Sequence, residues 1–308
     1  MSATDQTAPR AAGASIKSTL AGILPPLAMP FDGSGEIVMS AIGEQIDLMV
    51  DRKVNAVVVG GSTGEGHTLD REEFAAVMGA ASRAIGGRVP LVAGLIVNST
   101  REAIARIRML DGIPLAALQI TPVHYLFKPD ADATIQHFRA IHEACGLQIL
   151  IYNVIPWNYL DVSLMLRIMD EVPGVVGMKQ SAGDLKSVSD LVAGTPKANV
   201  VLTGTDALLY PAFALGVDGA ISALTTAVPG VCVALWNAVR AGDHKTALDL
   251  HRRLAVLWNA MPHDILPACV KYAQHRQGLG LYPPRAPMSR LDQGRKEAID
   301  AALRGLPV

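Results

Sequence analysis

The sequence predicts an α/β fold, specifically a (β/α)8 TIM barrel with a C-terminal helical extension. Short β-branched runs alternate along the chain with longer segments of helical spacing, which is typical of parallel βα units. There are eight such runs, the number of strands that closes a barrel. Several runs, such as residues 57–59 (Val-Val-Val), are apolar on consecutive residues, as expected of strands buried on both faces.

The eight expected strands are residues 23–30, 56–60, 91–96, 116–121, 148–152, 175–179, 200–203 and 219–223. The segments between them have recognisable helix starts, for example at Asp70, where Glu73 can complete a capping box. From about residue 228 onward the chain is helical in character and broken by prolines. A doubly wound open sheet is the alternative fold. It is weakened because no glycine-rich dinucleotide turn follows the first strand.

These elements divide the chain into three parts. We expect a flexible tail over residues 1–18, the barrel through its eighth strand over 19–228, and the last barrel helix with the helical extension over 229–308. The tail is rich in Ala, Ser and Thr and lacks an apolar core, so it does not resemble a signal peptide. No apolar run approaches the roughly 20 residues that a membrane span needs.

The composition narrows the class of partner. Twenty-seven basic and 28 acidic residues leave a net charge of −1, so we expect neither nucleic acid nor an anionic membrane as a partner. A small molecule or another protein is expected instead. The three cysteines, Cys145, Cys232 and Cys269, are odd in number and scattered, which indicates reduced thiols and a cytoplasmic location.

Lys179 is the most informative residue, because it ends an apolar run and is followed directly by Gln180 and Ser181. An unpaired ammonium in an apolar site is costly, so this lysine must be either paired or used. We expect it to be used, as an amine nucleophile that forms an imine with a 2-oxo acid. The alternative is an ion pair with Glu65 or another carboxylate at the end of the barrel.

Other polar residues also follow strands, at the barrel end where active sites lie. Gly61, Ser62 and Thr63 follow the second strand and offer backbone N–H groups and two hydroxyls to a small anion such as a carboxylate. The alternative is an ordinary glycine turn, with Glu65 tying it down. Tyr152 ends the fifth strand, where it can pass protons or be a buried tyrosine bonded to a backbone carbonyl.

Taken together, these segments resemble the dihydrodipicolinate synthase and N-acetylneuraminate lyase family of class I aldolases and dehydratases, which form a Schiff base. The resemblance covers essentially residues 20 to 290. The matching segments are residues 61–65, the Thr-Pro pair at 121–122, Tyr-Asn at 152–153 followed by Pro at 156, and residues 177–184. The family fold is a (β/α)8 barrel with a C-terminal helical extension, in agreement with the prediction above.

The resemblance implies a role for each matching residue. Lys179 would attack the 2-oxo carbon of a pyruvate-like substrate, Ser62 and Thr63 would hold its carboxylate, and Tyr152 would shuttle protons. Ser62 is also a candidate catalytic residue. The candidate substrate-binding residues are Ser62, Thr63, Gly61, Asp206 and Ser222. No metal or organic cofactor is implied, and the eight histidines show no His-Glu-x-x-His grouping.

Departures from the family pattern concern the substrate. Synthases of lysine biosynthesis carry an arginine two residues after the proline, where this chain has Asn158, so the lysine-pathway reaction is doubtful. Sialic acid lyases place an acidic pair after the seventh strand, where this chain has Asp206 followed by Ala207. Residues 157–159 (Trp-Asn-Tyr) add bulk near the expected pocket, which favours a shorter or more apolar second half of the substrate.

The synthases also place a tyrosine two residues after the Thr-Pro pair, and that tyrosine reaches a neighbouring subunit's site. His124 occupies this position here and Tyr125 follows it, so either can replace the tyrosine. We assign Tyr125 an auxiliary catalytic role. Family members are usually tetramers built from dimers, so the resemblance implies a homotetramer.

We therefore expect a cytoplasmic, Schiff-base-forming lyase of the aldolase type, which cleaves or forms a C–C bond to pyruvate. The enzymatic alternative is a dehydratase or deaminase that acts on a 2-oxo-3-deoxy acid or a cyclic imino acid through the same imine. The non-enzymatic alternative is a catalytically silent barrel that binds a 2-oxo acid. The second substrate, the direction and the stereochemistry stay open.

Overall fold

The computed structural model describes residues 15–307 of the chain. All eight expected strands form, and they make one parallel sheet in the order β1-β8-β7-β6-β5-β4-β3-β2. The strands are β1 (Gly22–Ile23), β2 (Val57–Val59), β3 (Leu91–Leu95), β4 (Ala117–Ile120), β5 (Ile149–Asn153), β6 (Val175–Gln180), β7 (Val200–Thr203) and β8 (Gly219–Ala220).

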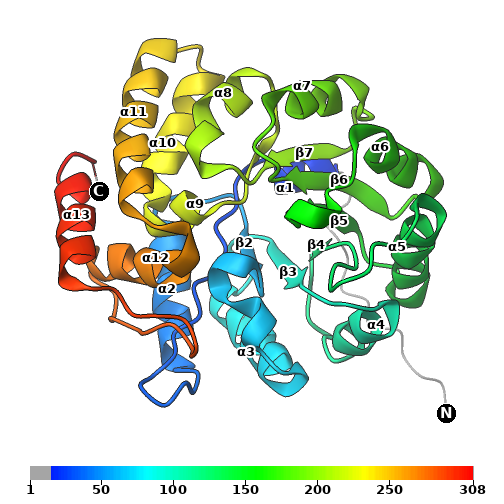
Figure 1. The fold of residues 1–308 in the computed structure, drawn as a ribbon, viewed down its shortest axis with the longest axis horizontal. Coiled ribbons are helices and arrows are strands. Elements are labelled where there is room, and N and C mark those ends of the chain that lie inside the picture. Colours follow the sequence, from blue (N-terminus) through cyan, green and yellow to red (C-terminus); the bar gives the residue numbers. More distant parts are fainter. Residues whose placement is uncertain (1–14, 308) are drawn as a thin grey trace.

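The helices lie around the outside of these strands (Figure 1). They are α1 (Ile16–Leu20), α2 (Ser40–Asp51), α3 (Arg71–Ile85), α4 (Thr100–Arg108), α5 (Ala131–Cys145), α6 (Val162–Glu171), α7 (Leu185–Gly194), α8 (Leu209–Ala214), α9 (Ala223–Ala227), α10 (Pro229–Arg240), α11 (His244–Ala260), α12 (Leu266–His275) and α13 (Gln293–Leu303). The predicted capping box at the start of α3 is confirmed, with Asp70 and Glu73 each accepting the other's backbone N–H.

The two edge strands of the sheet, β1 and β2, are joined by the segment that follows β1. Pro26 forms a parallel bridge with Val58, and the backbone N–H of Leu27 donates to the carbonyl of Val58 at 2.7 Å. The first strand is shorter than the expected run 23–30, because the prolines at positions 25 and 26 have no N–H to donate to a ladder. Eight parallel strands with surrounding helices fit a (β/α)8 barrel.

Side chains on the strands alternate between the barrel interior and the layer that packs against the helices. The interior cluster of buried apolar residues includes Ala117 on β4 and Leu150 on β5. The intervening residue Leu118 belongs instead to the larger cluster between strands and helices. Gln119 and Tyr152 follow the two interior residues by two positions, so they too face the interior.

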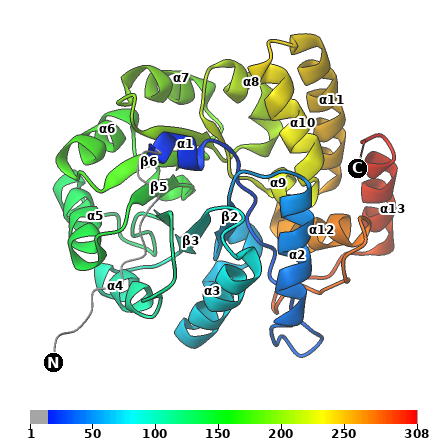
Figure 2. The same cartoon turned by 180° about the vertical axis from the view of Figure 1, so that it is seen from behind.

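The ends of the chain extend beyond the strands. Helix α1 begins inside the segment that was expected to be a tail, and residues 1–14 of that segment lie outside the described residues. Ile16 and Leu20 of α1 pack on the interior cluster, and the helix covers one end of the strands (Figure 2). Helices α10 to α13 follow β8, and α12 lies close to α2 (Figure 1). The boundaries at 18/19 and 228/229 stay predictions.

Cys145, Cys232 and Cys269 are all unpaired thiols, and the last two are buried. Within residues 15–307, no helix combines the length and the apolar character that crossing a bilayer requires.

His137 on α5 gives the fold a pH dependence. Its ring Nδ1 lies 2.9 Å from Thr100 Oγ1 on α4, and burial lowers the pKa of His137 from 6.5 to about 4. The unfolded chain therefore takes up this proton near pH ~6.5, whereas the folded chain takes it up only near 4. Neutral His137 therefore contributes its full stability above pH ~6.5, and this contribution is lost as the pH falls toward 4.

We expect the free energy of unfolding to fall by roughly 3 kcal/mol more in the wild type than in a His137→Asn variant across this window. Urea denaturation at a series of pH values measures the difference. Parallel pH profiles for the two proteins would contradict the prediction.

Candidate active site

Three residues from separate strand ends form a contiguous row. Tyr152 on β5 and Lys179 on β6 are partners in the strand register, and the Lys179 Nζ atom lies 3.9 Å from the centroid of the Tyr152 ring. The Tyr152 hydroxyl is 3.0 Å from Ser62 Oγ, in the loop after β2. Lys179 and Tyr152 are both buried. The row thus links an amine, a phenol and a serine hydroxyl.

Lys179 is not paired with Glu65, because Glu65 forms its ion pair with a different lysine, Lys271. Among the described residues, no carboxylate lies within 4.0 Å of the Lys179 Nζ atom. The Lys179 amine is therefore not held in a salt bridge within the described part of the chain. Sequence reasoning missed Gly204, which makes room for this lysine. A Cβ atom at residue 204 would lie 2.6 Å from Lys179 Cε and 2.1 Å from Ser181 Oγ.

The loop after β2 is a tight turn. Its 3₁₀ helix η1 (Ser62–Gly64) is closed by the N–H groups of Gly64 and Gly66, which both donate to the carbonyl of Gly61 at 3.1 Å. Gly60 enters the turn with a φ of 87°, and a Cβ there would lie 2.5 Å from a backbone oxygen of β3, so the position requires glycine. Thr63, the next residue, is largely buried. The turn presents the Ser62 hydroxyl to Tyr152.

Glu65 ties this turn to the C-terminal part of the chain. Its fully buried carboxylate lies 2.5 Å from Lys271 Nζ on α12 and accepts the backbone N–H of Arg285 at 2.9 Å. Both cations also lie over the Phe31 ring, at 4.7 Å for Lys271 and 4.4 Å for Arg285. Burial lowers the pKa of Lys271, and the negative charge of Glu65 opposes this shift. The pair anchors the turn that carries Ser62.

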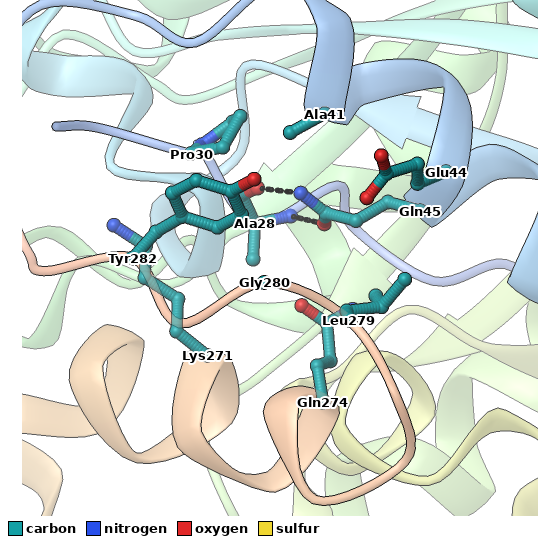
Figure 3. A pocket seen from close by; sticks show the side chains of 10 residues that line it. All are labelled: Ala28, Pro30, Ala41, Glu44, Gln45, Lys271, Gln274, Leu279, Gly280 and Tyr282. Atoms are coloured by element: carbon teal, nitrogen blue, oxygen red, sulfur yellow. Dashed lines mark hydrogen bonds between the residues drawn. The ribbon is translucent and has the colours of Figure 1, made fainter.

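Lys271 also lines a small pocket between α2 and α12 (Figure 3). In this pocket the Gln45 carboxamide of α2 pairs with both backbone groups of Ala28, accepting at 3.2 Å and donating at 2.7 Å. Lys271 itself donates to the carbonyl of Pro283 at 2.9 Å. Its ammonium therefore has protein partners on several sides, unlike that of Lys179.

We expect a Lys271→Met variant to be less stable by about 3 kcal/mol, because it leaves the Glu65 carboxylate buried without its counter-charge. Chemical denaturation measures the change. The double variant Lys271→Met with Glu65→Gln removes both charges and should regain part of the loss. A single variant as stable as the wild type would refute the prediction.

Asp206 and Ser222 lie together at the start of α9. The buried Asp206 carboxylate accepts the backbone N–H groups of Leu224 at 2.6 Å and Ala223 at 3.3 Å, and burial raises its pKa. Asp206 is therefore already bound to the protein's own backbone. The Ser222 hydroxyl is buried beside the Asp206 carboxylate. The substrate-binding role of both residues stays a prediction.

Tyr125 lies outside the Ser62–Tyr152–Lys179 row within this chain. Its side chain is 74% exposed, and Trp157, 64% exposed, donates from its indole to the carbonyl of His124 at 2.7 Å. The bulk expected from Trp157 is thus directed to the surface rather than into the barrel. Asn158 is buried and donates to the carbonyl of Val123 at 2.6 Å. The auxiliary catalytic role of Tyr125 stays a prediction.

Sequence reasoning also missed Gln119 on β4. Its side chain is completely buried and faces the barrel interior, yet neither of its polar side-chain atoms has a partner among the described residues. No periodic pattern marks such a residue, because a glutamine on a strand is ordinarily exposed.

Within residues 15–307, no three His, Cys, Asp or Glu side chains come together as a metal site requires.

Known proteins of similar sequence and fold match nearly the whole chain. The profile of the dihydrodipicolinate synthetase family matches residues 19–306. The chain is 34% identical to a 4-hydroxy-tetrahydrodipicolinate synthase of Thiobacillus denitrificans, with 93% of this chain and 97% of the relative covered. It is 30% identical to the 4-hydroxy-tetrahydrodipicolinate synthase of Archaeoglobus fulgidus, with 92% and 98% covered. The crystal structure of a putative dihydrodipicolinate synthetase from Pseudomonas aeruginosa superimposes with a TM-score of 0.88 at 27% identity, with 93% of this chain and 99% of that chain covered.

Proposed function

The chain belongs to the dihydrodipicolinate synthetase family, lyases of the class I aldolase type, and we propose that its Lys179 forms a Schiff base with pyruvate or a related 2-oxo acid. The enzyme then cleaves or forms a C–C bond to the pyruvate unit. The observation that carries the proposal is the buried Lys179 amine, which lies over the Tyr152 ring while the Tyr152 hydroxyl meets Ser62.

The proposed mechanism uses these three residues in turn. The Lys179 amine attacks C2 of the 2-oxo acid, and the resulting carbinolamine loses water to give the protonated imine. Tyr152 and Ser62 form a hydroxyl relay, 3.0 Å apart, that carries protons to and from the reacting oxygen. Ser62 and Thr63, with the N–H groups of their turn, hold the carboxylate, so binding also orients C2 toward the amine.

The protonated imine is the step that makes the bond change possible. Its positive nitrogen accepts the electron pair released when the C3–C4 bond breaks, and the same electron pair forms that bond in the synthetic direction. The enamine left on Lys179 is then protonated at C3, and hydrolysis of the imine releases pyruvate. All atoms of the exchange come from substrate, water and the three side chains.

A second candidate function is loss of water or ammonia from the same iminium. The surroundings of Asn158 support this second function. Its amide is buried and donates a hydrogen bond to the carbonyl of Val123. The chain therefore lacks, at this position, the arginine that holds the second substrate's carboxylate in lysine-pathway synthases. A hydroxylated 2-oxo-3-deoxy acid would need no such partner.

The proposal also includes the cellular location and the oligomeric state of the enzyme. We propose that the enzyme is cytoplasmic, since its cysteines are unpaired thiols, and that it assembles as a homotetramer in the manner usual for the family. Helices α11 to α13 would form the C-terminal extension of the barrel. Asp206 and Ser222 remain candidates for contact with the second half of the substrate.

The decisive experiment is reduction of the protein with borohydride in the presence of pyruvate, followed by peptide mapping. We expect added mass on the peptide that contains Lys179. The absence of an adduct on Lys179 would refute the proposal and favour a catalytically silent barrel that binds a 2-oxo acid. A panel of 2-oxo-3-deoxy acids then separates the two candidates, because aldol cleavage releases pyruvate and dehydration or deamination does not.

A further inference from the structure

Two buried polar side chains of β4 and its end, Gln119 and Thr121, have no protein partner. Both residues are completely buried, and the carboxamide nitrogen and oxygen of Gln119 and the hydroxyl of Thr121 all lack hydrogen bonds within the described part of the chain. Exchanging the nitrogen and oxygen positions of the Gln119 amide would not provide a hydrogen bond, because both atoms lack a partner among the described residues. Leaving a buried polar group unsatisfied costs about 1–3 kcal/mol, so such groups ordinarily exist to meet a ligand or an ordered water.

The Gln119 amide lies inside the barrel, near the active-site residues. Gln119 faces the interior, two positions beyond Ala117 of the interior cluster. Its register partner on β5 is Leu150, and Tyr152 lies two positions farther along the same face of that strand. Its Nε2 atom is 3.9 Å from the point where a Cβ of Gly61 would stand. The amide is therefore placed between the carboxylate turn and the strand that carries Tyr152.

The chemistry of these atoms selects the kind of group they would bind. A carboxylate only accepts hydrogen bonds, so it would satisfy the Gln119 Nε2 atom and leave the Oε1 atom unpaired. A hydroxyl group both donates and accepts, so it can pair with the Gln119 oxygen or nitrogen and with the Thr121 hydroxyl. An apolar group would satisfy none of them.

From these observations we infer that Gln119 and Thr121 form a polar subsite that binds a hydroxyl group of the substrate, and that the substrate is a hydroxylated 2-oxo acid. This inference rests on the proposed function, and it narrows the substrate class. It replaces the expectation of a shorter or more apolar second half, which was based on the bulk of residues 157–159. Within that segment the Trp157 side chain is exposed.

The test is a Gln119→Met variant, which keeps the length of the side chain and removes both polar atoms. Lys179 is trapped with borohydride at increasing concentrations of pyruvate, which carries no hydroxyl group, or of 2-oxo-3-deoxygluconate, which carries several. We expect the half-saturating concentration to rise about 10- to 100-fold for the hydroxylated acid only, the effect of losing one or two hydrogen bonds. Leu118→Met, on the opposite face of β4, is the matched control and should change neither value.

Thermal unfolding of the same variants provides a second readout. Removing an unpartnered amide from the interior should leave the melting temperature of Gln119→Met unchanged or raise it. A structural amide predicts the opposite pattern, in which stability falls and both half-saturating concentrations stay the same. That pattern would overturn the inference.

Two other outcomes are separable. Equal weakening for pyruvate and the hydroxylated acid would assign Gln119 to the carboxylate turn and overturn the hydroxyl subsite. A wild type that traps neither acid refutes the proposed function before any variant is made. Calorimetric titration of 2-oxo-3-deoxygluconate into wild type and Gln119→Met would then decide the subsite separately, since equal binding to both proteins overturns it.

Discussion

A Lys179→Ala variant is expected to lose all pyruvate-dependent chemistry, with turnover reduced at least ~10⁴-fold. The alanine has no amine to attack the 2-oxo carbon, and the Tyr152 ring and the Ser62 hydroxyl then lack the Lys179 amine that lies beside them. Lys271 cannot substitute, because its ammonium is held by Glu65 and the carbonyl of Pro283. Borohydride trapping and steady-state turnover measure the loss together.

The matched control for this variant is Lys186→Ala. Lys186 is an exposed lysine on α7 that pairs with Asp190 on the same helix, so its loss should leave trapping and turnover unchanged. The fold of Lys179→Ala should also persist, because Lys179 has no ion pair to lose. A pyruvate adduct on some other lysine, with turnover retained, would show that the row of three residues is not the reacting centre.

The second large effect is expected from Tyr152→Phe, which should lower turnover by about 10²–10³-fold while an imine still forms slowly. The substitution keeps the ring over which the Lys179 Nζ atom lies and removes only the hydroxyl that meets Ser62. Collapse of the carbinolamine then lacks its proton relay. Stopped-flow measurement of imine formation and steady-state turnover separate this step from binding.

Ser62→Ala and the double variant test whether the two hydroxyls act as a unit. In the proposed mechanism Ser62 and Tyr152 share one relay, so the double variant should be little worse than Tyr152→Phe alone. Tyr159→Phe is the control, since the hydroxyl of Tyr159 lies 3.5 Å from the carbonyl of Ser181 and takes no part in the relay. Fully additive losses would indicate that the serine and the tyrosine work separately.

The fold was largely predictable from the sequence. The barrel strands are buried on both sides, so each one is a run of consecutive apolar residues in the sequence. Strand length was less predictable. The run that begins at residue 23 continues as apolar sequence, but its two prolines end the regular ladder and leave only a bridge at Pro26 to pair with β2. The capping box at Asp70 was predictable because it depends on residues three positions apart.

The site was predictable where it depends on strand ends. Ser62, Tyr152 and Lys179 each follow or end an apolar run, and parallel strands deliver those ends to the same edge. The partners of Glu65 were not predictable, because Lys271 and Arg285 lie more than 200 positions away in sequence and carry no local signal. The unpartnered state of Gln119 was equally hidden, since it depends on what is missing around the side chain rather than on the residue itself.

The tie between Glu65 and Lys271 has a consequence for how the protein is made. The turn that carries Ser62 is synthesised within the first quarter of the chain, but the cation that neutralises its buried carboxylate belongs to α12. A chain that still lacks α12 leaves the Glu65 carboxylate without its counter-charge, so we expect the turn after β2 to be completed only when α12 is in place. We therefore expect fragments that end before α12 to lack the contact that holds the turn carrying Ser62.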